Sequence, residues 1–102
     1  EVNIVLRRHN AAFCLYELAG FRTTNEITAD WTYVRLHGPG GKYQGKYGTE
    51  QLSEWAELIR QWTRELKSIY VYFDNDQAAY AVHNALELKQ LLGLRLQTFK
   101  AA

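Results

Sequence analysis

Residues 49–67 carry apolar side chains at the spacing of a single α-helical face, and a short apolar segment of strand character lies on each side of them. These segments, residues 31–37 (WTYVRLH) and 68–73 (SIYVYF), are rich in aromatic and β-branched residues, which favours strands. A strand, a helix and a second strand in this order predict two parallel strands joined by a right-handed crossover. The apolar helical face consists of Leu52, Trp55, Ala56, Ile59, Trp62 and Leu66.

The alternation of strand and helix patterns continues in both directions along the chain. Residues 11–16 (AAFCLY) form a continuous apolar run, typical of a strand covered on both faces, and residues 2–9 are compatible with the end of a helix. Residues 17–30 contain several turn formers and are interpreted as a loop. Residues 77–92 predict a second amphipathic helix that ends at Gly93. The sequence therefore predicts an α/β fold of parallel βα units, with the second helix directing inward Ala78, Ala81, Val82, Ala85, Leu88 and Leu92.

The length of the chain suits one domain but not a closed parallel barrel. A parallel sheet needs helices on both faces or closure into a barrel, and a complete TIM barrel takes about 250 residues. The chain has 102 residues, begins with Glu1 and contains no methionine. We therefore expect a single domain over residues 1–102 that is a fragment of a longer protein.

Composition excludes several classes of protein. Hydrophobic residues make up 47% of the chain and charged residues 23%, so a packed core is expected. The net charge of +1 gives no electrostatic reason to expect a nucleic acid or an anionic membrane as partner. No apolar run approaches the roughly 18 residues of a membrane helix. Cys14 is the only cysteine, which excludes an internal disulfide, fits a reducing, cytoplasmic compartment and is expected to be an inert core thiol.

Residues 35–48 (RLHGPGGKYQGKYG) raise the question of a phosphate-binding loop. Gly40, Gly45 and Lys46 fit the frame G-x-x-x-x-G-K, but Tyr47 stands where the small Mg²⁺-binding hydroxyl belongs. The helical period also begins only after Thr49, the expected cap, whereas a phosphate loop requires the helix to start at the lysine. The sequence therefore argues against nucleoside triphosphate binding at this loop.

Two other interpretations of the glycine loop stay open. Glycines let backbone N–H groups approach an anion, to which Arg35, Lys42 and Lys46 would add charge-assisted hydrogen bonds. Tyr43 and Tyr47 are the two aromatic residues of the loop expected to stack on a ligand. The alternative is a flexible connection with solvated lysines.

Polar residues follow two neighbouring strands at the point where each strand ends. Arg35 and His37 alternate with apolar residues and therefore share one face of their strand, and Asp74 and Asn75 follow the next strand directly. In parallel α/β folds ligands bind at these carboxyl ends. Asp74 or Asn75 either caps the following helix or pairs with Arg35 or His37 across the strand ends.

These positions define the candidate site. His37 and Asp74 are the candidate catalytic residues, with the imidazole as acid or base. No metal site is expected, since the stripe of Asp76, Tyr80, His83 and Glu87 is typical of a solvated helix face. The candidate ligand-binding residues are Arg35, Gly38, Gly41, Lys42, Tyr43, Tyr47, Asn75 and Asp76.

Two long segments resemble a known family. Residues 28–56 (TADWTYVRLHGPGGKYQGKYGTEQLSEWA) and 69–92 (IYVYFDNDQAAYAVHNALELKQLL) are similar to the C-terminal part of the YecE-like family, domain of unknown function 72. The resemblance implies a TIM-barrel-like fold, of which this chain would supply about three βα units. Asp74 departs from the family's commoner asparagine. The resemblance marks as functional Arg35, His37, Gly38, Gly41, Tyr43, Gly45, Tyr47, Asn75, Asp76 and Asn84.

The sequence leaves two functions from different classes open. The first is an enzyme-like or anion-binding pocket at the carboxyl ends of the strands, which would take an anionic small molecule. The second is a non-catalytic binding or assembly module. Three parallel strands leave open sheet edges, which favours a homo-oligomer. The sequence does not decide whether the protein is an enzyme, and it indicates no particular cofactor.

Overall fold

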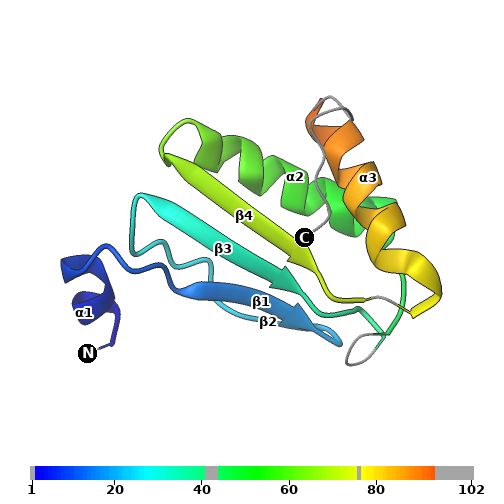
Figure 1. Cartoon of the computed structure of the whole chain (residues 1–102), viewed down its shortest axis with the longest axis horizontal. Helices are drawn as coiled ribbons and strands as arrows, with labels where there is room; N and C mark the ends of the chain where they lie inside the picture. Colours follow the sequence, from blue (N-terminus) through cyan, green and yellow to red (C-terminus); the bar gives the residue numbers. More distant parts are fainter. Residues whose placement is uncertain (1, 41–43, 76, 94–102) are drawn as a thin grey trace.

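The computed structural model describes residues 2–40, 44–75 and 77–93 and has a mixed α/β fold. Its sheet has the strand order β2-β1-β3-β4. Strands β1, β3 and β4 are parallel and point toward the same end of the sheet, whereas β2 is antiparallel to β1 (Figure 1). The elements are α1 (Val2–Arg8), β1 (Cys14–Leu18), β2 (Phe21–Arg22), β3 (Trp31–Leu36), α2 (Thr49–Thr63), β4 (Ser68–Phe73), the 3₁₀ turn η1 (Gln77–Ala79) and α3 (Tyr80–Leu92).

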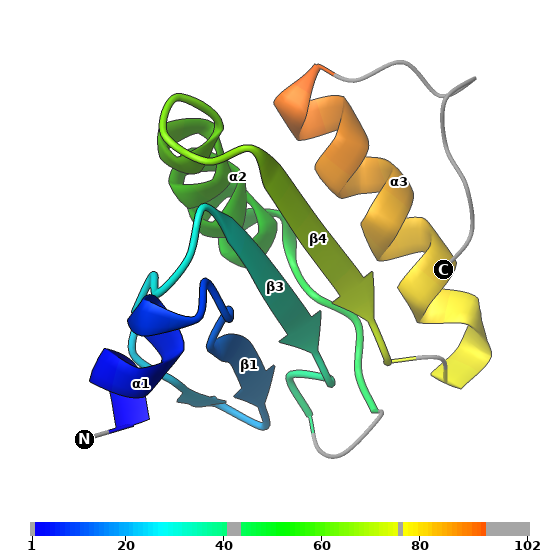
Figure 2. The same ribbon diagram turned by 60° about the vertical axis from the view of Figure 1, so that its left-hand side comes forward.

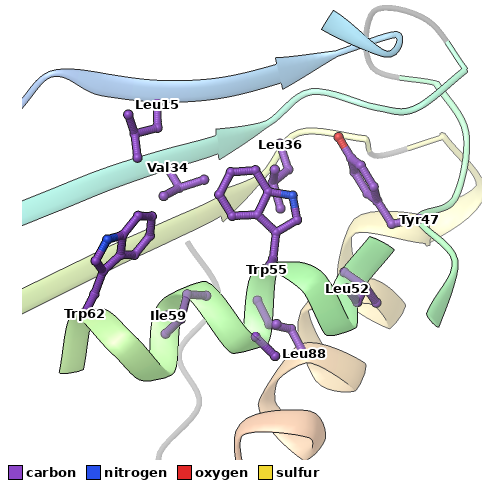
Figure 3. Packing of buried hydrophobic residues seen from close by; sticks show 10 residues of the cluster. Leu15, Val34, Leu36, Tyr47, Leu52, Trp55, Ile59, Trp62 and Leu88 are labelled. Atoms are coloured by element: carbon purple, nitrogen blue, oxygen red, sulfur yellow. The ribbon is translucent and has the colours of Figure 1, made fainter. Parts of the chain in front are cut away.

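One face of the sheet is covered by α2 and α3, and the core lies between them (Figures 1 and 2). The predicted helical period is confirmed, because the inward side chains of α2 lie against those of β1 and β3 (Figure 3). Alternation along β3 places Val34 and Leu36, both 0% exposed, on this face. The buried core consists of Leu15, Val34, Leu36, Tyr47, Leu52, Trp55, Ala56, Ile59, Trp62 and Leu88.

The opposite face of the sheet, which we call the open face, is aromatic and polar. The register aligns Tyr16 of β1, Arg35 of β3 and Tyr72 of β4. The ring of Tyr33 meets that of Tyr72 edge to face, at 5.3 Å between centroids. Tyr70 is 47% exposed. The open face therefore carries side chains that suit contact with a polar ligand or with further protein.

The prediction for the first strand was wrong in its bounds and its burial. The strand begins at Cys14, not at residue 11, and runs to Leu18. Among the described residues, one face of the strand is covered: Leu15 is buried beneath α2, whereas Cys14 points the other way and is partly exposed. Burial, more than its neighbours, raises the pKa of the Cys14 thiol. Cys14 is therefore a residue of the open face and not the core thiol that the apolar run suggested.

Residues 17–30 are not only a loop, as predicted, because they contain strand β2. Ala19 and Gly20 form a two-residue hairpin turn with φ of 50° and 89°, the pattern of a type I′ turn. The connection from β2 to β3 contains no helix. It is anchored by the buried Thr28 hydroxyl, which accepts a hydrogen bond from Phe13 N and donates one to Ala11 O. The sheet is therefore mixed, and β1 and β3 are not joined by a helical crossover.

Replacing Ala19 by asparagine is expected to stabilise the protein. A left-handed conformation is unfavourable for alanine, whereas asparagine tolerates it and asparagine–glycine is a preferred type I′ pair. The free energy of unfolding should rise by about 0.5–1 kcal/mol, measured by urea denaturation. Ala29→Asn, at a position outside the left-handed region, is the control. If both variants changed the free energy of unfolding equally, the result would argue against a type I′ turn at Ala19–Gly20.

The helix ends also differ from the predictions. Helix α2 starts at Thr49 but is not capped by it: Gln51 Oε1 accepts a hydrogen bond from Gly48 N instead. The helix ends at Thr63, short of the predicted residue 67, because the chain must turn back into β4. Neither Asp74 nor Asn75 caps α3, which begins after Ala79. On α3, Leu88 is buried as expected, but Val82 is exposed because the buried face of the helix is centred on Asn84 and Leu88. Ala78, also expected to point inward, lies in the 3₁₀ turn η1 and is exposed.

Candidate functional site

At the carboxyl ends of β3 and β4, Asp74 lies between Arg35 and His37. Its Oδ2 accepts hydrogen bonds from Arg35 Nε at 2.9 Å and from Arg35 Nη2 at 2.6 Å. The same oxygen lies 3.3 Å from His37 Nδ1. The predicted pairing across the strand ends is confirmed for Asp74, and it places one carboxylate against two basic side chains.

The parallel register of β3 and β4 explains this placement. Leu36 is paired with Phe73, so the next residue on each strand lies at the same edge. The hydrogen bond from Asp74 N to Leu36 O, at 2.8 Å, extends the pairing by one residue. Strand alternation then turns the side chains of Arg35 and His37 to the open face. These side chains are 39% and 21% exposed, so the site is accessible but partly desolvated.

The electrostatics of the site favour a charged guanidinium and an oriented imidazole. The hydrogen bond that Arg35 donates to Asp74 is the largest cause that raises the pKa of Arg35. The position of Asp74 favours the proton of His37 on Nδ1. The ring of Tyr16 packs edge to face against that of His37, at 5.9 Å between centroids. The arrangement is chemically suited to acid–base work and to hydrogen bonding of a polar ligand.

Three glycine N–H groups in the described part of the glycine loop are occupied by the protein itself. Gly40 N donates to Gln44 O, and Gly45 N donates to Gln77 Oε1. Gly38 N donates to the Tyr47 hydroxyl. Amides engaged in this way do not form a ready cradle for a phosphate. The candidate residues Gly41, Lys42 and Tyr43 lie outside the described residues, as does Asp76.

Tyr47 is a core residue and does not lie on the loop surface, as stacking on a ligand would require. It is 1% exposed, and its ring meets Phe73 edge to face at 6.0 Å. Its hydroxyl points to the strand ends, where it accepts from Gly38 N at 2.9 Å and is hydrogen-bonded to the Glu17 carboxylate (Figure 3). Burial raises the pKa of Glu17, against opposing effects of Arg22 and of this hydrogen bond. The expectation failed because the chain before α2 folds back over the end of the sheet.

Asn75 and Asn84 form a buried amide network behind the site. Asn75 Nδ2 donates to Gly45 O and to Asn84 Oδ1. Asn84 in turn bonds both backbone groups of Tyr47. Both asparagines are 0% exposed, so Asn75 is not placed to touch a ligand or His37. Residue patterns alone missed Asn84, because an asparagine on a helix is usually a solvated residue; only the family resemblance marked it.

Tyr47 predicts a loss of stability in alkaline solution. Burial is the largest cause that raises the pKa of Tyr47 above its ordinary value of about 10. Above about pH 10 the unfolded chain loses this proton while the folded chain keeps it, so the free energy of unfolding falls as pH rises. One proton gives a slope of at most about 1.4 kcal/mol per pH unit. Between about pH 9 and 11, the free energy of unfolding measured by urea denaturation should fall more steeply with pH in the original chain than in Tyr47→Phe. An equal slope in both proteins would contradict the role of the Tyr47 hydroxyl.

Over residues 2–40, 44–75 and 77–93, no group of three or more His, Cys, Asp or Glu side chains is arranged to hold a metal ion. Within the same ranges, no helix combines the length and the hydropathy needed to cross a membrane.

Comparison with known proteins identifies relatives without an assigned activity. The sequence model of a family described as "Protein of unknown function DUF72" matches residues 1–102. No protein with a curated description matches the chain. A crystal structure of a DUF72 family protein from Thermotoga maritima is similar with a TM-score of 0.80 and 29% sequence identity, covering 89% of this chain and 40% of that one.

Two crystal structures of a DUF72 family protein from Enterococcus faecalis are also similar. Their TM-scores are 0.81 and 0.74, at 16% and 19% sequence identity, and they cover 92% and 91% of this chain. At this identity the likeness shows the fold. The chain spans about two fifths of the length of each structure, 40–41%.

Proposed function

Because this chain belongs to the DUF72 family of proteins of unknown function, we propose a function from its own chemistry: an acid–base pocket for a small anionic molecule at the carboxyl ends of β3 and β4. The observation that carries the proposal is the position of Asp74 Oδ2 between Arg35 and His37. Asp74 orients the imidazole, His37 exchanges the proton, and Arg35 holds an anionic group of the ligand.

The charge of the pocket limits what it binds. Asp74 cancels the charge of Arg35, so attraction of a bare anion is weak. Arg35 still has N–H donors beyond the two that Asp74 occupies, and these are directional. A ligand with a carboxylate or phosphate group and a hydroxyl near His37 fits this donor set.

We further propose that the complete fold is TIM-barrel-like, with the open face as its interior. In the described part of the chain, helices cover the parallel strands on one face, which supports this arrangement, as does the span of about two fifths of the related structures. The pocket would then lie at the mouth of the barrel, where such folds bind ligands.

A single cysteine, Cys14, supports a cytoplasmic location for the protein.

The test measures ligand binding by NMR titration with inorganic phosphate and with a small hydroxycarboxylate as probes. His37→Ala and Arg35→Ala are each expected to weaken binding about tenfold to a hundredfold, the loss of one charge-assisted hydrogen bond. His83→Ala, at an exposed position of α3, and Arg64→Ala, at the exposed residue that follows α2, are matched controls. Unchanged binding in the two site variants, with the fold intact, would sink the proposal.

A second candidate function is assembly of copies of this chain. In the described residues, β4 is hydrogen-bonded to β3 alone, so its other edge is open. A groove of about 860 Å³ runs beside it, between α2 and α3. We propose that a second copy pairs with this edge in a homo-oligomer, which would complete more of the sheet. We expect a dissociation constant for self-association in about the micromolar range. If sedimentation shows only monomers at protein concentrations of about 100 times that value, the assembly proposal fails.

A further inference from the structure

The backbone on both sides of the His37 side chain is fixed by three hydrogen bonds. His37 N donates to Glu17 O at 2.9 Å, and Ala19 N donates to Gly38 O at 2.8 Å. The third bond, from the buried Gly38 N to the Tyr47 hydroxyl, is the one made by a side chain. Gly38 has a φ of 127°, a conformation that side chains disfavour, so the chain turns sharply directly after His37.

Tyr47 is itself held through its backbone by Asn84. Asn84 Oδ1 accepts from Tyr47 N at 2.9 Å, and Asn84 Nδ2 donates to Tyr47 O at 3.0 Å. Asn84 Oδ1 also accepts from Asn75 Nδ2 at 2.8 Å. Asn75 directly follows Asp74 in the chain. The same buried network therefore reaches the backbone next to both partners of the His37–Asp74 contact.

We propose that Tyr47 and Asn84 are positioning residues that set the His37–Asp74 contact from behind the site. The connections form a closed circuit: Asp74, Asn75, Asn84, Tyr47, Gly38–His37 and back to Asp74. Neither positioning residue touches Arg35 or the imidazole by any contact described above.

The geometry makes the contact sensitive to this network. His37 Nδ1 and Asp74 Oδ2 are 3.3 Å apart, just beyond the usual range of about 2.7–3.2 Å for an N–H···O hydrogen bond. A displacement of a few tenths of an ångström at Gly38 would therefore decide whether this contact tightens or is lost, because rigid packing transmits such shifts. The inference rests on the proposed function, in which an oriented His37 exchanges the proton.

The test reads the tautomer of His37 in the folded protein by two-dimensional ¹⁵N NMR of the full chain. The spectrum is recorded near pH 8.5, well above the unperturbed pKa of histidine. The chain has 3 histidines, and the exposed His9 and His83 serve as internal references. In the unmodified chain, His37 is expected to carry its proton mainly on Nδ1, unlike the two references.

In Tyr47→Phe the Nδ1–H fraction of His37 is expected to fall at least twofold, as in Asp74→Asn. Phenylalanine keeps the ring that packs on Phe73, so this variant retains its core. Tyr70→Phe removes a hydroxyl from an exposed ring of β4 and is expected to leave the tautomer unchanged. Asn84→Ala should act like Tyr47→Phe; where Asn84→Ala does not fold, the result for Tyr47→Phe decides.

The outcomes separate a positioning role from a purely structural one. A folded Tyr47→Phe with lowered stability but an unchanged His37 tautomer would overturn the inference, because the hydroxyl would then serve stability alone. A changed tautomer supports it. If the tautomer responds to Tyr47 while His37→Ala leaves probe binding unchanged, the positioning role stands and the proposed pocket fails.

Discussion

Trp55→Ala is expected to lower the free energy of unfolding by about 3–5 kcal/mol, the range for removing a large aromatic side chain from a core. Trp55 is 1% exposed and lies at the middle of the α2 face, between the helix and the sheet (Figure 3). The Arg22 guanidinium lies over the Trp55 ring, 4.0 Å from the ring centroid, in a cation–π contact. Since single domains are stable by only about 5–15 kcal/mol, this one change removes a large share of the total.

Urea denaturation followed by circular dichroism measures the effect of Trp55→Ala without relying on tryptophan fluorescence. Glu54→Ala is the control, because Glu54 is the preceding residue of α2 and is exposed. Its free energy of unfolding should stay within about 0.5 kcal/mol of the original chain. A loss below about 1 kcal/mol in Trp55→Ala would mean that α2 does not pack on the sheet as described.

Asn84→Ala is expected to lower the free energy of unfolding by about 2–4 kcal/mol, the second largest effect. The change removes the partners of Tyr47 N and Tyr47 O and one partner of Asn75 Nδ2. A buried polar group left without a partner costs about 1–3 kcal/mol. Alanine favours helices more than asparagine does, which offsets part of the loss.

The matched control for Asn84→Ala is His83→Ala. His83 is the neighbouring residue on α3 and is exposed, and alanine improves helix propensity there as well. The difference between the two variants in urea denaturation therefore isolates the buried hydrogen bonds. Equal free energies of unfolding in the two variants would show that the buried hydrogen bonds of Asn84 do not stabilise the protein.

The long, periodic elements and the pairing of Asp74 followed from the sequence for clear physical reasons. Helix α2 repeats its apolar spacing over several turns, so it has a single apolar face that can pack on the sheet. Strands β3 and β4 flank a single helix, so their carboxyl ends meet at one edge. That topology alone brings Asp74 toward Arg35 and His37, without any knowledge of side-chain packing.

Other features depend on tertiary contacts that local patterns do not contain. Strand β2 has two residues, and its turn uses Ala19–Gly20 in place of the stronger asparagine–glycine signal. The burial of Tyr47 follows from how the loop folds back onto Phe73, although the loop composition suggests an exposed ring. Asn84 is polar at a helical position, so only its neighbours in space reveal that it is buried.

The charged residues of the site all lie within one βαβ unit, and this has a consequence for biosynthesis. Arg35 and Asp74 are 39 residues apart, and β3, α2 and β4 between them already form a right-handed unit. During synthesis, domains form from the N-terminal side as the chain emerges. The guanidinium and the carboxylate can therefore neutralise each other as soon as β4 and Asp74 have left the ribosome.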